Sequence, residues 1–96
     1  MNALIHLQLG LHNGSLERLL RVIRHRGFHI SNMNVALTPD GQCYDVTLRI
    51  ESQRQLLLLT RQLSKLTDVM QLDVLSQGSH KIATNEELGG DYVRTA

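Results

Sequence analysis

The side chains best suited to chemistry are five histidines and a single cysteine. They are His6, His12, His25, His29, His80 and Cys43. The histidines lack the HxH or HxxxH spacing of a metal site, and no second cysteine could join them as a ligand. Cys43 has no basic cluster nearby in the sequence to favour its thiolate, so a small packing residue is the simpler interpretation. We therefore expect neither a metal site nor a catalytic residue.

The turn at His12, Asn13, Gly14 and Ser15 is a candidate ligand site. Its backbone N–H groups and one side-chain amide precede a predicted helix, where the helix dipole favours a carboxylate or a phosphate. Ser15 is the predicted N-cap of that helix. Such turns are also common without any ligand, so an ordinary capped turn is the competing interpretation.

Basic side chains gather on the same predicted helix and at its end. They are Arg18, Arg21, Arg24, His25 and Arg26. A solvated face is the default interpretation, and a cationic last turn also complements the helix dipole. The alternative is a docking surface for an acidic partner, because exposed arginines set association rate and register. The docking candidates are Arg18, Arg21 and Arg26.

Apolar periodicity predicts the elements that would position these residues. Alternation of apolar and polar residues predicts four strands, at residues 5–11, 28–37, 44–51 and 70–74. In the second strand the apolar residues change parity, which predicts a bulge near Ser31 and Asn32. Apolar spacings of three and four predict two helices between these strands. The first ends at a glycine cap, Gly27, and the second follows the capping-box pair Ser52 and Gln55.

The predicted order strand, helix, strand, strand, helix, strand belongs to the α+β class. It is the ferredoxin-like βαββαβ arrangement, a four-stranded antiparallel sheet with two helices on one face. The 96 residues suit one domain. Periodicity stops after Leu75, so we expect a domain at 1–75 and a polar, flexible C-terminal tail at 76–96. The polar outer face of the sheet favours self-association through sheet edges.

Composition narrows the range of partners. Ten basic and nine acidic side chains give a net charge of +1, which creates no field that would gather nucleic acid or anionic lipid. No apolar run approaches the roughly 18 residues that span a bilayer. The single cysteine and an N-terminus without a secretory pattern favour a cytoplasmic protein. We expect no nucleic-acid partner and no membrane partner.

Four segments are similar in sequence to those of a known family: GSLERLLRV at 14–22, RHRGFHI at 24–30, NMNV at 32–35 and QLSKLTDV at 62–69. They resemble the ACT domain of acetohydroxyacid synthase (acetolactate synthase) small subunits. The run R-G-F-H-I-x-x-M-N-V is the most specific part of the resemblance. Its sequence is most like that of the isozyme II small subunit. The resemblance covers residues 5–74. The second domain of longer small subunits is expected to be missing.

This resemblance implies a non-catalytic regulatory subunit that forms a homodimer through ACT sheet edges. It would bind and activate the catalytic large subunit in branched-chain amino acid biosynthesis. Thiamine diphosphate, Mg and FAD would belong to that partner, with no cofactor in this chain. Many members also bind valine between two ACT protomers. The corresponding effector-binding positions here are Leu11, Asn13, Gly14, Ser15, His29 and Ile30.

Two effector positions depart from the family pattern. Leu11 stands where the pattern has an asparagine three residues before Gly14, and His29 replaces the asparagine of the G-[FY]-N-I run. Gly14 and Ile30 match, and Asn13 substitutes for the missing amide if the turn is read as shortened. Each lost amide would remove about 1–3 kcal/mol of ligand stabilisation. We therefore expect weak or absent valine feedback, as in the valine-insensitive isozyme II branch.

Three other functions share this order of elements. An RNA-recognition module needs aromatic platforms on its central strands, but Tyr44 and Phe28 both have core parity. An acylphosphatase-like enzyme needs an arginine in a phosphate-cradling loop, whereas Arg18 follows Gly14 at helical spacing. A stand-alone ACT protein that binds an amino acid and regulates another target is the closest alternative.

Overall fold

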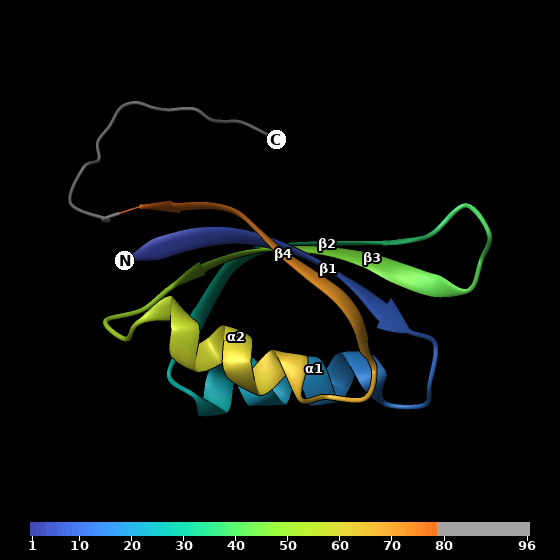
Figure 1. Ribbon diagram of the computed structural model, residues 1–96, viewed down its shortest axis with the longest axis horizontal. Coiled ribbons are helices and arrows are strands. Elements are labelled where there is room, and N and C mark those ends of the chain that lie inside the picture. Colours follow the sequence, from blue (N-terminus) through green and yellow to red (C-terminus); the bar gives the residue numbers. More distant parts are fainter. Residues whose placement is uncertain (79–96) are drawn as a thin grey trace.

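A four-stranded antiparallel sheet is covered on one face by two helices (Figure 1). The computed structural model describes residues 1–78. Its elements are β1 (Asn2–Gly10), α1 (Ser15–His25), β2 (His29–Leu37), β3 (Cys43–Glu51), α2 (Leu56–Ser64) and β4 (Val69–Gly78). The strand order is β2-β3-β1-β4, so β2 and β4 form the two edges. This confirms the predicted ferredoxin-like βαββαβ fold.

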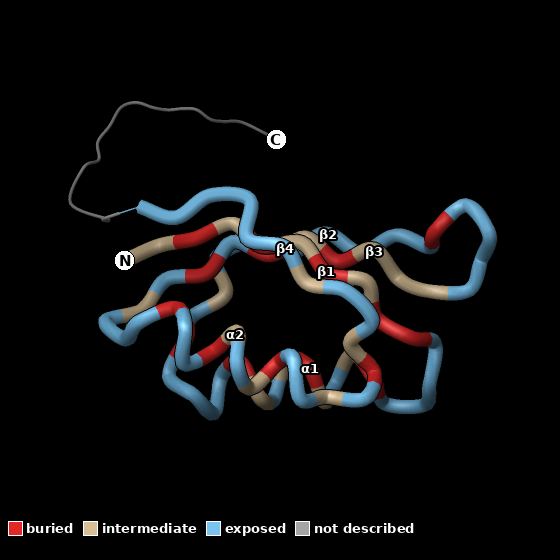
Figure 2. The backbone as a smooth tube through the Cα atoms, in the orientation of Figure 1, coloured by how far each residue is buried: buried red, intermediate tan, exposed pale blue. Residues whose placement is uncertain are grey.

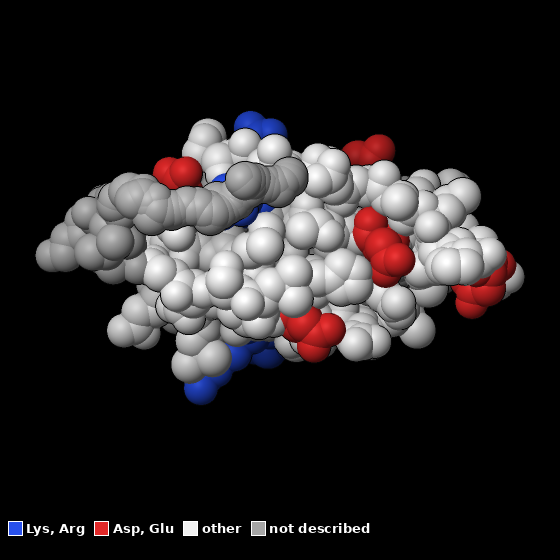
Figure 3. Space-filling view, turned by 90° about the horizontal axis from the view of Figure 1, so that it is seen from above, with Lys and Arg blue, Asp and Glu red and all other residues white. Residues whose placement is uncertain are grey.

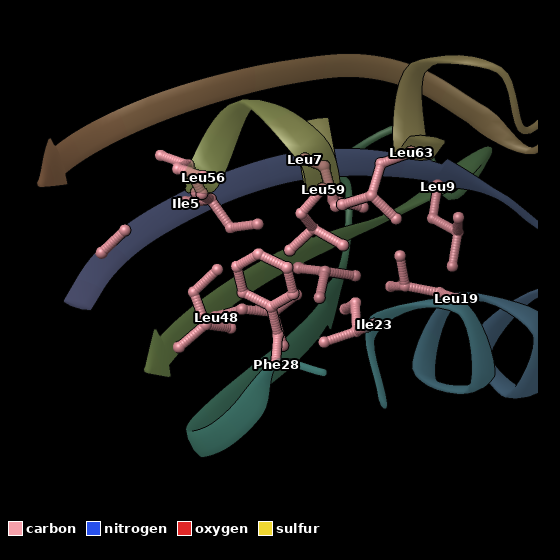
Figure 4. Close-up of a cluster of buried hydrophobic side chains, with 13 residues drawn as sticks. Ile5, Leu7, Leu9, Leu19, Ile23, Phe28, Leu48, Leu56, Leu59 and Leu63 are labelled. Carbon is pink, nitrogen blue, oxygen red and sulfur yellow. The ribbon is translucent and has the colours of Figure 1, made fainter. Parts of the chain in front are cut away.

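The core lies between the helices and the facing side of the sheet (Figure 4). Buried and less buried positions alternate along β1 and the second half of β3, as strands with one covered face require (Figure 2). Leu19 and Ile23 of α1 and Leu59 and Leu63 of α2 are fully buried from the helix side. Each such aliphatic side chain contributes about 1.5–3 kcal/mol by leaving water.

The edge strands contain bulges, of which the sequence predicted one. In β2 Ile30 pairs with Ile50 and Asn32 with Arg49, so Ser31 is the extra residue and the predicted bulge is confirmed. In β4 two residues, Met70 and Leu75, have no opposite partner on β1. The predicted regular alternation of this strand was therefore wrong.

The last strand also extends further than expected. β4 runs to Gly78, so residues 76–78 belong to the sheet rather than to the predicted tail. The pairing of Asn2 with Gly78 explains this extension, because β1 supplies a partner that apolar periodicity does not reveal. The rest of the predicted flexible tail, residues 79–96, lies outside the described residues, as does His80.

Both predicted serine caps were wrong. Gly14 occupies the N-cap of α1 with a left-handed φ of 77°, and Ser15 is the first helical residue and is buried. Helix α2 begins only at Leu56, and Ser52 instead accepts a hydrogen bond from the Arg54 N–H. The predicted glycine cap is confirmed, since Gly27 has a φ of 87° directly after Arg26, the C-cap residue of α1.

Candidate functional site

Helix α1 separates the two halves of the candidate effector site. Leu11, Asn13 and Gly14 lie in the connection before α1, and His29 and Ile30 begin the strand after it (Figure 1). The helix has 11 residues, which at 1.5 Å per residue amounts to roughly 16 Å. One chain therefore cannot bring both halves onto a single amino acid. A complete site of this kind requires a second copy.

The effector positions differ in their accessibility. Leu11, Asn13, Gly14 and His29 are exposed, so a ligand or a second chain could reach them. Ile30 is half-buried and packs against the core. Ser15 is buried, and its N–H bonds to the carbonyl oxygen of His12 at 3.0 Å. The Ser15 side chain is thus a packing group of the turn in this conformation.

Asp68, between α2 and β4, holds the connection before α1 in place. Its Oδ1 lies 2.7 Å from Nδ1 of His12, and its Oδ2 accepts a hydrogen bond from Nε of Arg18 at 2.9 Å. The Asp68 carbonyl oxygen also accepts the N–H of Gly10 at 2.7 Å. The carboxylate side chain is only 7% exposed. We call Asp68, His12 and Arg18 the turn clamp, which sequence reasoning missed.

The turn clamp is a charged network. Arg18 presents both Nε and Nη2 to Oδ2 of Asp68, at 2.9 and 2.8 Å, which makes a charge-assisted contact. This hydrogen bonding to Arg18, and then that to His12, lowers the pKa of Asp68 despite the opposing effect of burial. Asp68 is therefore a carboxylate at neutral pH. The clamp orders the turn without a bound ligand.

The three predicted docking arginines occupy different environments. Arg18 is held by Asp68. Nη2 of Arg26 donates a hydrogen bond to Oε1 of Gln62 at 3.1 Å, which links the end of α1 to α2. Arg21 is exposed and makes no ion pair within residues 1–78. It lines a shallow surface pocket with Glu17, Arg24 and two other α1 residues, so it is the most available of the three.

In the described part of the chain the remaining histidine, cysteine and acidic side chains form no larger cluster. Nε2 of His6 lies 3.1 Å from Oδ1 of Asp45 on the sheet face that the helices leave open. Within residues 1–78, no three histidine, cysteine or acidic side chains gather as metal ligands. The open face shows scattered acidic and basic side chains rather than a continuous basic surface (Figure 3). Neither helix in the described part of the chain could span a membrane.

Comparison with known proteins adds independent information. The sequence model of the ACT domain matches residues 12–72. The chain is 51% identical over 55 residues to the acetolactate synthase isozyme 2 small subunit of Escherichia coli (strain K12), covering 57% of this chain and 63% of that protein. It is 30% identical over 81 residues to the isozyme 3 small subunit of the same strain, covering 83% of this chain and 50% of that protein.

A solved structure shares the fold. The small subunit of acetolactate synthase from Thermotoga maritima superposes with a TM-score of 0.69 at 16% identity. That match covers 77% of this chain and 47% of the other. The chain thus spans less than two thirds of each of these relatives.

Proposed function

Since this chain belongs to the ACT domain family, we propose that it is a non-catalytic regulatory subunit of an acetolactate synthase. The observation that carries this proposal is its 51% identity over 55 residues to an isozyme 2 small subunit. The chain would bind a catalytic large subunit and raise its activity in branched-chain amino acid biosynthesis in the cytoplasm. Thiamine diphosphate, Mg and FAD would be held by that partner.

The proposed subunit forms a homodimer through its β2 edge. Beyond the bulge, β2 pairs with β3 without interruption from Asn32 to Leu37, and its other side is open. The apolar residues Met33, Val35 and Leu37 are exposed there. An antiparallel β2 strand from a second copy would extend the sheet and cover these side chains.

The same homodimer would complete the effector site. The end of β2 lies on the side of the molecule where β1 leads into α1, and the start of β2 lies at the opposite end (Figure 1). Antiparallel pairing therefore brings His29 and Ile30 of one copy towards Leu11 and Asn13 of the other. Because Leu11 and His29 offer no side-chain amide, the proposed regulation includes weak or no valine feedback.

Purification of the full chain with its catalytic large subunit tests the proposal. Acetolactate formation is measured while the chain is titrated into the large subunit, with and without millimolar valine. We expect saturable activation that valine hardly changes. The absence of both binding and activation would reject the proposal. Amino-acid binding without activation would instead identify a stand-alone ACT sensor.

Strong valine inhibition of the activated enzyme would have a different meaning. The subunit assignment would then stand, and the interpretation of Leu11 and His29 would be wrong. A matched control uses bovine serum albumin at the same concentration, because nonspecific protein stabilises dilute enzymes. Activation by the control protein would remove the support that activation gives to the proposal.

A further inference from the structure

The turn clamp places a carboxylate of the chain itself at the candidate effector site. Nε and Nη2 of Arg18 lie 2.9 and 2.8 Å from Oδ2 of Asp68, and Nδ1 of His12 lies 2.7 Å from its Oδ1. Proteins hold the carboxylate of a ligand through charge-assisted hydrogen bonds of the same kind. Asp68 therefore occupies groups that would otherwise be available to a ligand carboxylate.

The clamp side chains also cover the connection between β1 and α1. Nη1 of Arg18 is 3.1 Å from the position that a Cβ atom on Gly14 would take, and Gly14 is the N-cap of α1. Cε1 of His12 lies 3.0 Å from the corresponding position at Gly10. A ligand that contacts Gly14 would therefore also contact the guanidinium group of Arg18.

The positive charge of Arg18 is balanced within the chain. Its guanidinium pairs with the Asp68 carboxylate, whose side chain is 7% exposed, whereas the Arg18 side chain is 43% exposed. The exposed Glu17 adds a negative charge in the first turn of α1. A ligand carboxylate thus meets no unbalanced positive charge at Arg18, although it could reach the guanidinium from solvent.

The main chain keeps Asp68 next to the turn. Its carbonyl oxygen accepts the N–H of Gly10 at 2.7 Å, beside the pairing of Leu9 with Val69 across β1 and β4. A competitor tethered in this way acts at a high effective concentration, so a free ligand displaces it only when the ligand is concentrated as well. The backbone contact does not involve the carboxylate, and it remains possible when that side chain is removed.

We propose that the Asp68 carboxylate is an internal competitor, which the carboxylate of an amino-acid effector must displace from Arg18. This inference rests on the proposed function, because it concerns the regulation of the same site. It gives weak valine feedback a second cause besides Leu11 and His29. Those two positions change the contacts that a ligand can make, whereas the internal competitor decides whether Arg18 is available to it.

The test titrates the full chain at pH 7 with sodium acetate and with valine, and follows the amides of the turn by NMR. Acetate presents the carboxylate alone, and sodium chloride keeps the ionic strength constant. The main variant is Asp68→Ala, and Asp68→Asn replaces it if circular dichroism shows unfolding. The control Asp45→Ala removes a carboxylate that also contacts a histidine, but on the open sheet face. The variant Asp68→Ala/Arg18→Gln removes the competitor and its cation together.

We expect Asp68→Ala to bind acetate and valine more tightly than the native chain and the Asp45→Ala control, by about tenfold or more. The gain should disappear in Asp68→Ala/Arg18→Gln, because the guanidinium that binds the carboxylate is gone. A purely structural role of Asp68 would not tighten the binding of a carboxylate. Unchanged affinity in the folded Asp68 variants would overturn the internal competitor, as would a gain that survives without Arg18.

Activation of the large subunit by the native chain in the absence of valine tests the proposed function separately. Activation without tighter carboxylate binding in the Asp68 variants would reject the internal competitor and leave the proposed function intact. If the native chain neither binds nor activates the large subunit, the proposed function is rejected. Tighter acetate binding by Asp68→Ala would in that case still support the internal competitor as a property of the turn.

Discussion

The carboxylate of Asp68 lies 2.7 Å from Nδ1 of His12, and this contact ties the connection before α1 to the start of β4. Arg18, from the first turns of α1, binds the other oxygen of the same carboxylate. An effector that had to order this turn would lose conformational entropy on binding. The turn clamp already orders this turn through side chains of the same chain, before any ligand binds.

Replacing Asp68 by asparagine should loosen the turn. Asp68→Asn removes the negative charge that holds His12 and Arg18, so we expect lower stability and faster amide hydrogen exchange at Gly10 and Ser15. Exchange measured by NMR at constant pH checks this. The matched control is Asp45→Asn, because Asp45 also pairs with a histidine but lies on the open sheet face. Equal exchange at the turn in both variants would contradict the role of the clamp.

The clamp also predicts a dependence of stability on pH. Its hydrogen bonds to Arg18 and His12 lower the pKa of Asp68 below the ordinary value of 3.8. A depressed native pKa contributes stability that is complete above the unfolded value and is lost as the pH falls through the native value. We therefore expect the free energy of unfolding to drop below about pH 4, and to drop less in Asp68→Asn.

Urea unfolding from pH 6 to pH 2.5 measures this difference. Some acid sensitivity should persist in Asp68→Asn, because hydrogen bonds from the Thr38 hydroxyl and the Gln42 N–H also lower the pKa of Asp40. The double variant Asp40→Asn/Asp68→Asn should be the least sensitive. Parallel curves for the native chain and Asp68→Asn would show that Asp68 does not contribute to acid unfolding.

Local signals predicted much of the fold. The bulge at Ser31 follows from a parity change, and the end of α1 at Gly27 follows from the freedom of glycine at positive φ. The serine caps failed because residue type and spacing do not fix the backbone conformation that decides where a helix begins. At α1 the left-handed Gly14 takes the N-cap, and at α2 the helix begins later, which leaves Ser52 to donate to the carbonyl oxygen of Gly27.

Long-range contacts set the limit of that prediction. His12 and Arg18 are 56 and 50 residues from Asp68, so no spacing rule connects them. The same limit applies to β4. Met70, Leu72 and Val74 alternate as in a regular strand, and only the register against β1 shows that Met70 is an extra residue. The effector positions were placed by resemblance, whereas the helix that separates them was already predicted from apolar spacing and is confirmed as α1.

Two leucines of α2 should respond differently to truncation. Leu59 is fully buried and Leu57 is 53% exposed. Leu59→Ala should lower the free energy of unfolding by about 2–5 kcal/mol, because it removes apolar burial and leaves a cavity. Leu57→Ala should change it by about 0.5 kcal/mol. Urea denaturation at pH 7 measures both. Similar losses would mean that Leu57 is covered in solution, as by self-association, and protein-concentration dependence would identify that case.

Restoring the family's amides should create a valine site. In Leu11→Asn/His29→Asn each new amide can hydrogen-bond the ligand, for about 1–3 kcal/mol apiece. That energy corresponds to roughly 5- to 150-fold tighter binding for each amide. Calorimetry with valine should therefore detect tighter binding than in the native chain, and we expect valine to inhibit the activated synthase more strongly. Leu11→Ala/His29→Ala is the matched control, since it removes both side chains without adding an amide.

The gain should also depend on the homodimer. Because Leu11 and His29 lie beyond opposite ends of α1, the two new amides reach a single valine only when they come from different copies. Adding Val35→Glu, which places a charge on the exposed β2 edge, should separate the copies and abolish the new binding. Valine binding that survives in a monomer would show that one chain forms the site alone. No gain in the dimeric double variant would show that Leu11 and His29 are not what limits valine binding.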